Sequence, residues 1–250
     1  MTSGKYSALS GAIARDQAIA NLSANLANIS TTGYKRRSLS FEAMLRGEQQ
    51  RTRAQGINFN RVKTVVTDFS PGPLRHTENP FDVAIHGEGF FKIQGANGPL
   101  YTRRGDFVTD QAGVLRTSNG MMVLDEGGGP ITIPNADTSQ VVIGESGIVA
   151  IVNTDGGVDE VGQLAVVGID NPQNLRQEEN TLYSLGEGAA ETPLATPFRL
   201  VQGSLEMANV NMTEEMTRLI DNFRAYENYH KVIESYKAIS EQEDALGTLS

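Results

Sequence analysis

Cysteine and tryptophan are both absent from the 250-residue chain, and aromatic residues make up only 6% of it. The missing cysteines exclude disulfides, thiolate metal sites and thiol catalysis together. The three histidines, His76, His86 and His230, do not show the spacing of metal ligands. No phosphate-binding loop, nucleophile elbow or dinucleotide fingerprint occurs either. We therefore expect neither an enzyme nor a bound cofactor.

Long apolar runs are also missing. The longest, such as residues 147–152 and 164–169, are far shorter than the roughly 20 residues that a membrane span needs. Near the N-terminus Lys5 is not followed by an apolar segment, because Asp16 and Gln17 interrupt the pattern. We expect no membrane span and no cleaved secretion signal, and the net charge of −9 argues against a nucleic-acid partner.

The charge is distributed unevenly between the two ends of the chain. Residues 1–53 carry eight basic and three acidic side chains, whereas residues 204–250 carry nine acidic and four basic ones. Two interpretations are open: a chance asymmetry of solvated faces, or mutual attraction between the two ends.

Residues 3–29 carry a helical pattern without proline. Their apolar residues recur three or four positions apart in two sets, which are Tyr6, Leu9 and Ile13, and then Ile19, Leu22, Leu26 and Ile29. Beside them runs a row of amides, Gln17, Asn21, Asn25 and Asn28. The narrow stripe predicts a coiled-coil seam, and the amides are either an exposed flank or contacts that fix the register of other helices. Gly33 then allows the left-handed turn that ends such a segment.

Residues 212–246 carry a second and longer helical pattern. Asn211 with Glu214 has the form of a capping box at its start. Heptad steps connect Met212, Met216, Leu219, Phe223, Tyr226, His230 and Ile233. A second apolar edge comprises Tyr229, Val232, Tyr236 and Ile239. A helix with two apolar edges needs partners to cover them.

Between the helices the pattern changes to short strands separated by turns. The strand candidates are residues 62–66, 81–85, 89–93, 114–116, 121–124, 131–133, 141–143, 148–152, 163–167 and 198–201. Hairpin signals occur at Asn97-Gly98, Asn119-Gly120 and Asp155-Gly156. Residues 46–60 are polar and predict a loop or loosely ordered extension. The spacing of the candidates indicates an antiparallel sandwich or an irregular barrel.

These patterns predict an α+β chain. Long N- and C-terminal helices are expected to form a coiled-coil-like domain, with a central antiparallel β-rich domain between them. The expected divisions are an N-terminal helical assembly segment (1–35), a connecting extension (36–75), the β-rich central domain (76–203) and a C-terminal helical assembly segment (204–250).

Four further blocks of the sequence are NLANISTTGYK (25–35), NPFDVAIHGEGFF (79–91), YTRRGDF (101–107) followed by Asp110, Gly113 and Leu115, and QGSLEMANVN (202–211) followed by RAYE (224–227). These four blocks resemble signatures of the flagellar basal-body rod and hook proteins. The blocks occur in the family's order and span nearly the whole chain. Within the family, the segment DFSPGPLR (68–75) and the chain length are most similar to proximal rod subunits, and distal rod and hook subunits are the alternatives.

The resemblance implies a structural subunit of the bacterial flagellar rod that polymerises through its terminal helices into a tubular drive shaft. The implied partners are other copies of the chain, other rod proteins and the flagellar type III export apparatus, and the implied location is the periplasmic rod of the basal body. The expected assembly interface comprises Leu22, Asn25, Leu26, Asn28, Ile29, Met216, Leu219, Phe223, Tyr226 and Ile233.

A protein of another class is the competing hypothesis: a secreted β-rich enzyme or carbohydrate-binding module with helical appendages. That class requires a pocket within residues 80–200 in which polar or titratable groups converge.

Overall fold

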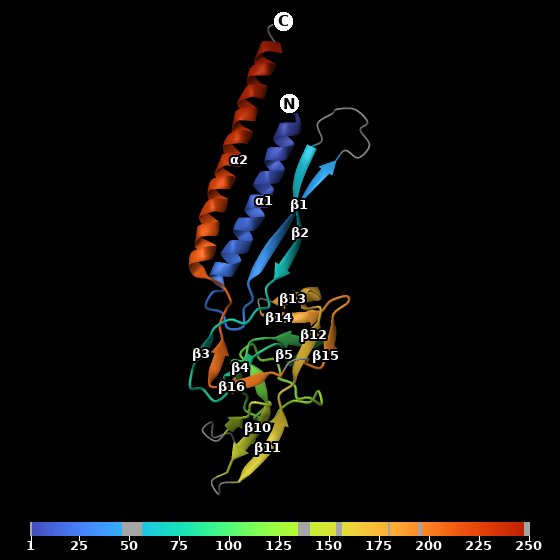
Figure 1. Cartoon of the computed structure of the whole chain (residues 1–250), viewed down its shortest axis with the longest axis vertical. Coiled ribbons are helices and arrows are strands. Elements are labelled where there is room, and N and C mark those ends of the chain that lie inside the picture. Colours follow the sequence, from blue (N-terminus) through green and yellow to red (C-terminus); the bar gives the residue numbers. More distant parts are fainter. Residues whose placement is uncertain are drawn as a thin grey trace. The chain divides into compact units, whose positions relative to one another are not determined.

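The computed structural model describes residues 2–46, 57–134, 141–153, 157–179, 181–194 and 197–247 (Figure 1). Within this part of the chain the residues group into two compact units. Unit 1 draws on residues 1–27, 37–68 and 210–250, and unit 2 draws on residues 28–36 and 69–209.

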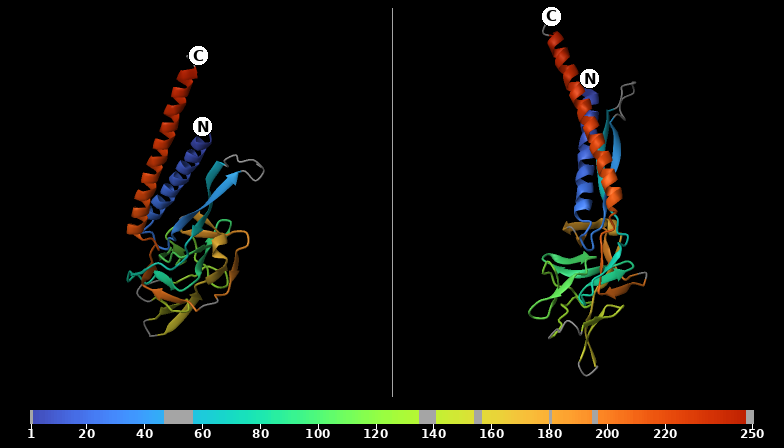
Figure 2. Two further views of the ribbon diagram at one scale, coloured as in Figure 1. Left: turned by 45° about the horizontal axis from the view of Figure 1, so that its top comes forward. Right: turned by 90° about the vertical axis from the view of Figure 1, so that its left-hand side faces the viewer.

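Unit 1 consists of two helices and one β-hairpin. Helix α1 (Thr2–Ala27) and helix α2 (Met212–Gly247) lie side by side, as the views in Figures 1 and 2 both show. Strands β1 (Arg37–Arg46) and β2 (Ile57–Thr67) pair in antiparallel fashion and contact α1. No helix among the described residues is long and apolar enough to cross a membrane.

The Asn211 half of the predicted capping box is confirmed at the start of α2. The Oδ1 atom of Asn211 accepts hydrogen bonds from the backbone N–H of Thr213 at 3.1 Å and of Glu214 at 3.3 Å. These contacts satisfy two N–H groups that have no partner inside the helix. The side chain of Glu214 accepts from Arg218 one turn further on, at 2.5 Å.

The prediction of a coiled-coil-like domain formed by the terminal helices is wrong. Unit 1 has only two helices among the described residues, and a β-hairpin packs on one of them. The first set of the expected α1 stripe also lies outside the helix contact, because Tyr6, Leu9 and Ile13 are 56%, 47% and 51% exposed, whereas Leu22 of the second set is buried. Small residues of α1 face α2 instead. The α+β class with a β-rich central part does describe the chain.

The expected loop at 46–60 is also corrected in its described part. Arg46 ends β1, and residues 57–60 begin β2, in a register that pairs Arg37 with Thr67 and Arg46 with Ile57. Residues 47–56 lie outside the described part of the chain. The strand candidate at 62–66 is confirmed inside β2, whereas β1 and the start of β2 were missed because these segments contain many polar residues.

Unit 2 is built from short strands. They are β3 (Leu74–His76), β4 (Val83–His86), β5 (Phe90–Gly95), β6 (Gly98–Thr102), β7 (Phe107–Thr109), β8 (Leu115–Thr117), β9 (Val141–Ile143), β10 (Ile148–Val152), β11 (Val158–Gln163), β12 (Val166–Asp170), β13 (Leu175–Glu179), β14 (Leu182–Leu185), β15 (Ala190–Thr192), β16 (Arg199–Gln202) and β17 (Ser204–Glu206). A 3₁₀ turn, η2 (Pro172–Asn174), precedes β13.

The strands pair in several small antiparallel sheets. A six-stranded sheet has the order β13-β14-β6-β5-β12-β15, and a three-stranded sheet has the order β11-β10-β9. The remaining strands form the pairs β16-β4, β17-β3 and β7-β8. The predicted antiparallel pairing is therefore confirmed for the described strands.

Some of the predicted strands are not continuous strands in the structure. Residues 121–124 and 131–133 contribute single bridges, such as Arg116 with Met122, and not continuous ladders. The candidate at 163–167 is divided, because Gln163 ends β11 and Val166 begins β12. The hairpin signal at Asn97-Gly98 is confirmed by the β5–β6 turn, whereas Asp155-Gly156 lies outside the described residues.

Two clusters of buried hydrophobic residues form the core of unit 2, and the larger contains Phe91 and Phe107. Phe91 and Phe107 meet edge to face at 5.1 Å between ring centroids, and both are almost completely buried. Beside them Gly105 approaches β4 so closely that a Cβ there would lie 1.7 Å from the carbonyl oxygen of Val83. The YTRRGDF block therefore needs glycine at this position for the chain to pass the core.

Candidate assembly interface

The helices of unit 1 run antiparallel, with glycines of α1 against tyrosine rings of α2. Gly4 lies against Tyr236, and a Cβ on Gly4 would lie 2.5 Å from the hydroxyl oxygen of Tyr236. Gly11 lies against Tyr229, and a Cβ on Gly11 would lie 2.5 Å from a ring carbon of Tyr229. Both glycines, and both tyrosines, are seven residues apart, so each pair occupies one helix face at successive double turns. The close approach of the two helices therefore depends on residues without side chains.

At the other end of this helix pair, the side chains of Asn21 and Asn25 form hydrogen bonds that link α1 to β1 and α2. Asn25 is only 1% exposed, and its Nδ2 donates to the carbonyl oxygen of Arg37 at 2.8 Å and to Oε2 of Glu215 at 3.1 Å. Its Oδ1 accepts from the backbone N–H of Arg37 at 3.1 Å, and Asn21 donates to the same Arg37 carbonyl at 2.7 Å. These amides therefore fix the start of β1 and the first turn of α2 against α1 within one chain.

Apolar side chains remain exposed on the outer sides of both helices. The α1 stripe comprises Tyr6, Leu9 and Ile13. The α2 flank comprises Met212, Met216, Ile220 and Phe223, which are 54%, 46%, 52% and 47% exposed. Single exposed apolar residues are ordinary on a protein surface. Rows of them at helical spacing are contiguous patches, and such patches mark sites of protein association.

The ten residues expected at the interface fall into three groups. Leu22 and Asn25 are buried inside unit 1. The exposed members, Met216 and Phe223, belong to the α2 flank. The others are half-buried, and they are Leu26, Leu219, Tyr226 and Ile233 in unit 1, and Asn28 and Ile29 in unit 2. Sequence reasoning missed Ile220, which lies one position off the expected heptad.

A buried ionic cluster in unit 2 was also missed. The carboxylate of Glu206 is fully buried; its Oε1 lies 2.7 Å from Nζ of Lys35, and its Oε2 lies 3.3 Å from Nη1 of Arg103. The backbone N–H of Gly72 donates to Oε1 at 2.9 Å, and Lys35 also donates to the carbonyl oxygen of Ser70 at 2.8 Å. Charged groups tolerate such burial only when they are paired and hydrogen-bonded.

The cluster explains why three separated sequence blocks occur together. Lys35 closes the block at 25–35, Arg103 belongs to YTRRGDF, and Glu206 belongs to QGSLEMANVN. The backbone reinforces the contact, because the N–H of Gly33 donates to the carbonyl oxygen of Glu206 at 2.8 Å. The sequence does show a charged residue inside each block. It does not show that these residues pair, because they are far apart along the chain.

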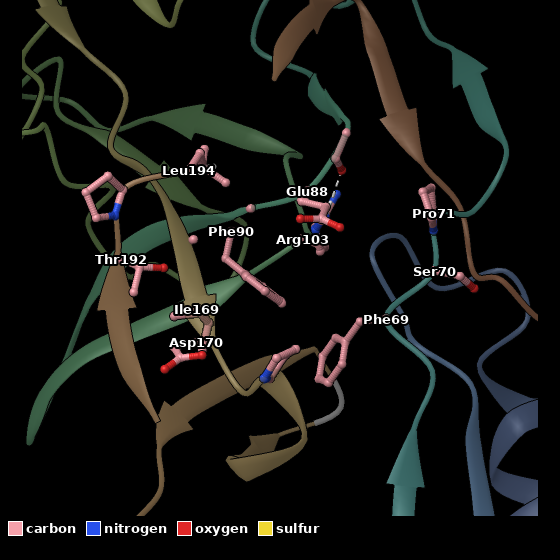
Figure 3. A pocket seen from close by; sticks show the side chains of 15 residues that line it. Phe69, Ser70, Pro71, Glu88, Phe90, Arg103, Ile169, Asp170, Thr192 and Leu194 are labelled. Carbon is pink, nitrogen blue, oxygen red and sulfur yellow. Dashed lines mark hydrogen bonds between the residues drawn. The ribbon is translucent and has the colours of Figure 1, made fainter. Parts of the chain in front are cut away.

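A pocket of about 620 Å³ lies beside this cluster in unit 2 (Figure 3). Its lining is largely apolar, with Phe69, Phe90 and Leu194 among its residues. Arg103 also lines it, but Nη2 of Arg103 donates to the carbonyl oxygen of Gly87 at 2.9 Å and its guanidinium lies 5.3 Å from the ring centroid of Phe90. Burial lowers the pKa of Arg103, and the charge of Glu206 opposes this shift.

The carboxylates of the pocket do not converge. Glu88 lies beside Arg103, whereas Asp170 lies beside Ile169 on another side of the pocket (Figure 3). An acid–base pair or a sugar-binding site needs polar groups that meet at one point. The lining of this pocket thus offers no support for the competing class of enzyme or carbohydrate-binding module.

Two helices with outward apolar rows, joined to a β-rich unit, define a structural subunit that associates with other chains. Sequence comparison finds three family descriptions along the chain. Residues 6–35 match "Flagella basal body rod protein", residues 84–151 match "Flagellar hook protein FlgE/F/G D1 domain", and residues 201–244 match "Flagellar basal body rod FlgEFG protein C-terminal".

Similar proteins cover most of the chain. The flagellar basal-body rod protein FlgF of Caulobacter vibrioides is 35% identical over 221 residues, which are 86% of each chain. The flagellar basal-body rod protein FlgG of Bacillus subtilis is 31% identical over 245 residues, 91% of this chain and 92% of the relative. FlgF of Mesorhizobium japonicum is 30% identical over 257 aligned positions, 100% of this chain and 98% of the relative.

The chain therefore belongs to the flagellar basal-body rod and hook protein family. It is a structural rod subunit of the flagellar basal body and not an enzyme, since the family is a structural one. The resemblance drawn from the four sequence blocks is confirmed.

Proposed function

We propose that this subunit polymerises into the tubular rod through the outer sides of its terminal helices, within residues 1–35 and 204–250. The observation that carries the proposal is the exposure of the α1 stripe and the α2 flank on helices whose inner faces are already packed. Contiguous apolar surface of this kind is stabilised when another protein covers it. The buried ionic cluster and the β-rich unit serve as a folded body that these helices carry.

The chain is proposed to be a proximal rod subunit. The segment at 68–75 and the chain length support this assignment through the family resemblance. A distal rod subunit is the second candidate. The sequence identities to the relatives named FlgF and FlgG, 35% and 31% in the two cases above, are too similar to separate the two kinds of rod subunit. Its neighbours would be further copies and the other rod proteins.

Delivery to the periplasmic rod is proposed to occur through the flagellar type III export apparatus, without cleavage of a signal. The family resemblance, which implies this export route, supports the proposal.

The test is deletion of the gene, followed by electron cryotomography of basal bodies in the deletion strain. Assembly is expected to stop before the rod is complete, and the chain supplied from a plasmid should restore the rod and motility. A stop at the base of the rod supports the proximal assignment, whereas a short rod supports the distal one. Complete rods with hooks in the deletion strain would refute both.

A further inference from the structure

We propose that the α1 stripe of one copy packs on the α2 flank of the next copy, so that copies join head to tail. The proposal rests on the proposed function, because it names the partner surface used in polymerisation. Its occupant is a second copy of this chain.

The two apolar rows match each other in spacing. Tyr6, Leu9 and Ile13 are separated by steps of three and four residues. Phe223, Ile220 and Met216, read backwards along α2, are separated by the same steps of three and four. Two antiparallel helices therefore bring all three pairs level at once: Tyr6 with Phe223, Leu9 with Ile220, and Ile13 with Met216.

The rows cannot cover each other within one copy. The internal register places Gly4 level with Tyr236, Gly11 with Tyr229, and Asn25 with Glu215. In that register Leu9 is level with residue 231, which is 11 residues from Ile220. At 1.5 Å per residue the offset is about 16 Å, or three helical turns. A second copy displaced by about this distance along the helix pair would remove the offset, and three whole turns would leave the helix faces almost unrotated.

Charge favours this pairing over contacts between identical helices. The sequence of α2 carries eight acidic and four basic side chains, whereas that of α1 carries two basic and one acidic. Two α2 helices in contact would repel each other, and two α1 helices in contact would leave the α2 flank exposed. A contact between different surfaces leaves one surface free on each end copy, so it can repeat and generates an open polymer when the rotation between copies does not close a ring.

The cysteine-free sequence allows a direct cross-linking test. Leu9→Cys and Ile220→Cys are introduced together in one chain, which is expressed beside the wild-type chain so that rods assemble. Isolated rods are oxidised and separated on a non-reducing gel. Dimers and larger species should appear and should collapse to monomer on reduction. A second pair, Ile13→Cys with Met216→Cys, prevents the local geometry of one disulfide from deciding the result.

Controls separate the proposed contact from random collision. Each single-cysteine chain should give no dimer, and Leu9→Cys with Thr217→Cys should give none, because Thr217 lies off the α2 flank. Dimers from a single-cysteine chain, or rods without cross-links from both designed pairs, would overturn the head-to-tail contact. The rod function would survive either outcome, since it depends on where assembly stops in the deletion strain.

Discussion

Replacing Glu206 by glutamine should destabilise unit 2 strongly. The substitution keeps the shape of the side chain but removes the charge that neutralises Lys35 at 2.7 Å and Arg103 at 3.3 Å. Both cations would then lose the carboxylate that lies between them, while their side chains, which are 0% and 3% exposed, stay buried. Breaking a buried ion pair from one side costs about 3–5 kcal/mol. For a unit of this size such a loss lowers the melting temperature by roughly 10 °C.

The assay is thermal unfolding of the purified full chain, followed by near-ultraviolet circular dichroism. Tyr34, Tyr101 and Tyr183 are almost completely buried in unit 2 and report on its packing. Glu145→Gln is the matched control, because Glu145 pairs with Arg199 at 3.6 Å through side chains that are 72% and 70% exposed, and it should leave the melting temperature unchanged. A Glu206→Gln chain that melts with the wild type would refute the assignment of the cluster as a structural anchor.

Two further predictions concern packing and pH. Gly11→Val should weaken the helix pair by about 1–3 kcal/mol in urea unfolding followed by far-ultraviolet circular dichroism, because its Cβ would meet the ring of Tyr229. The control Ser23→Val, at an exposed position of the same helix, should lower the free energy of unfolding by less. Equal losses from the two substitutions would contradict the tight contact at Gly11. Burial, followed by the hydrogen bond to Glu191, raises the pKa of Tyr101 above its usual value of 10.0. This stabilisation is complete below about pH 10 and is lost as the pH rises further, so the urea midpoint of unit 2 should fall between about pH 9 and pH 11 more in the wild type than in Tyr101→Phe. Parallel falls in the two chains would contradict this role of Tyr101.

Local signals in the sequence were sufficient for the start of α2 and for the turn that follows α1. Asn211 caps α2, and Gly33, six residues beyond the end of α1 at Ala27, adopts the left-handed conformation, with φ of 69°. Both features depend on residues next to each other in the chain. The face that each helix buries was not accessible in the same way, because leucine and isoleucine mark an apolar stripe more clearly than Gly4 and Gly11 do. The coiled-coil prediction assumed that the apolar stripe forms the contact between the helices, whereas the glycines of α1 form it in the structure.

Long-range pairing accounts for the other omissions. The β1–β2 hairpin joins Arg37 to Thr67, and the ionic cluster joins Lys35, Arg103 and Glu206. A single sequence carries no signal of which distant residues meet. Of the expected interface residues, Met216 and Phe223 lie on an exposed flank, and their part in assembly stays a prediction.

The central claim is that the outward apolar side of α2 carries assembly, and Phe223→Asp tests it most directly. The matched control is Thr217→Asp, six residues away and so about 120° around the same helix. Both chains should melt like the wild type, because both positions are exposed. Electron microscopy of basal bodies isolated from strains that carry each variant as the only copy should show rods with Thr217→Asp and none with Phe223→Asp. Intact rods and normal motility with a folded Phe223→Asp chain would contradict the account.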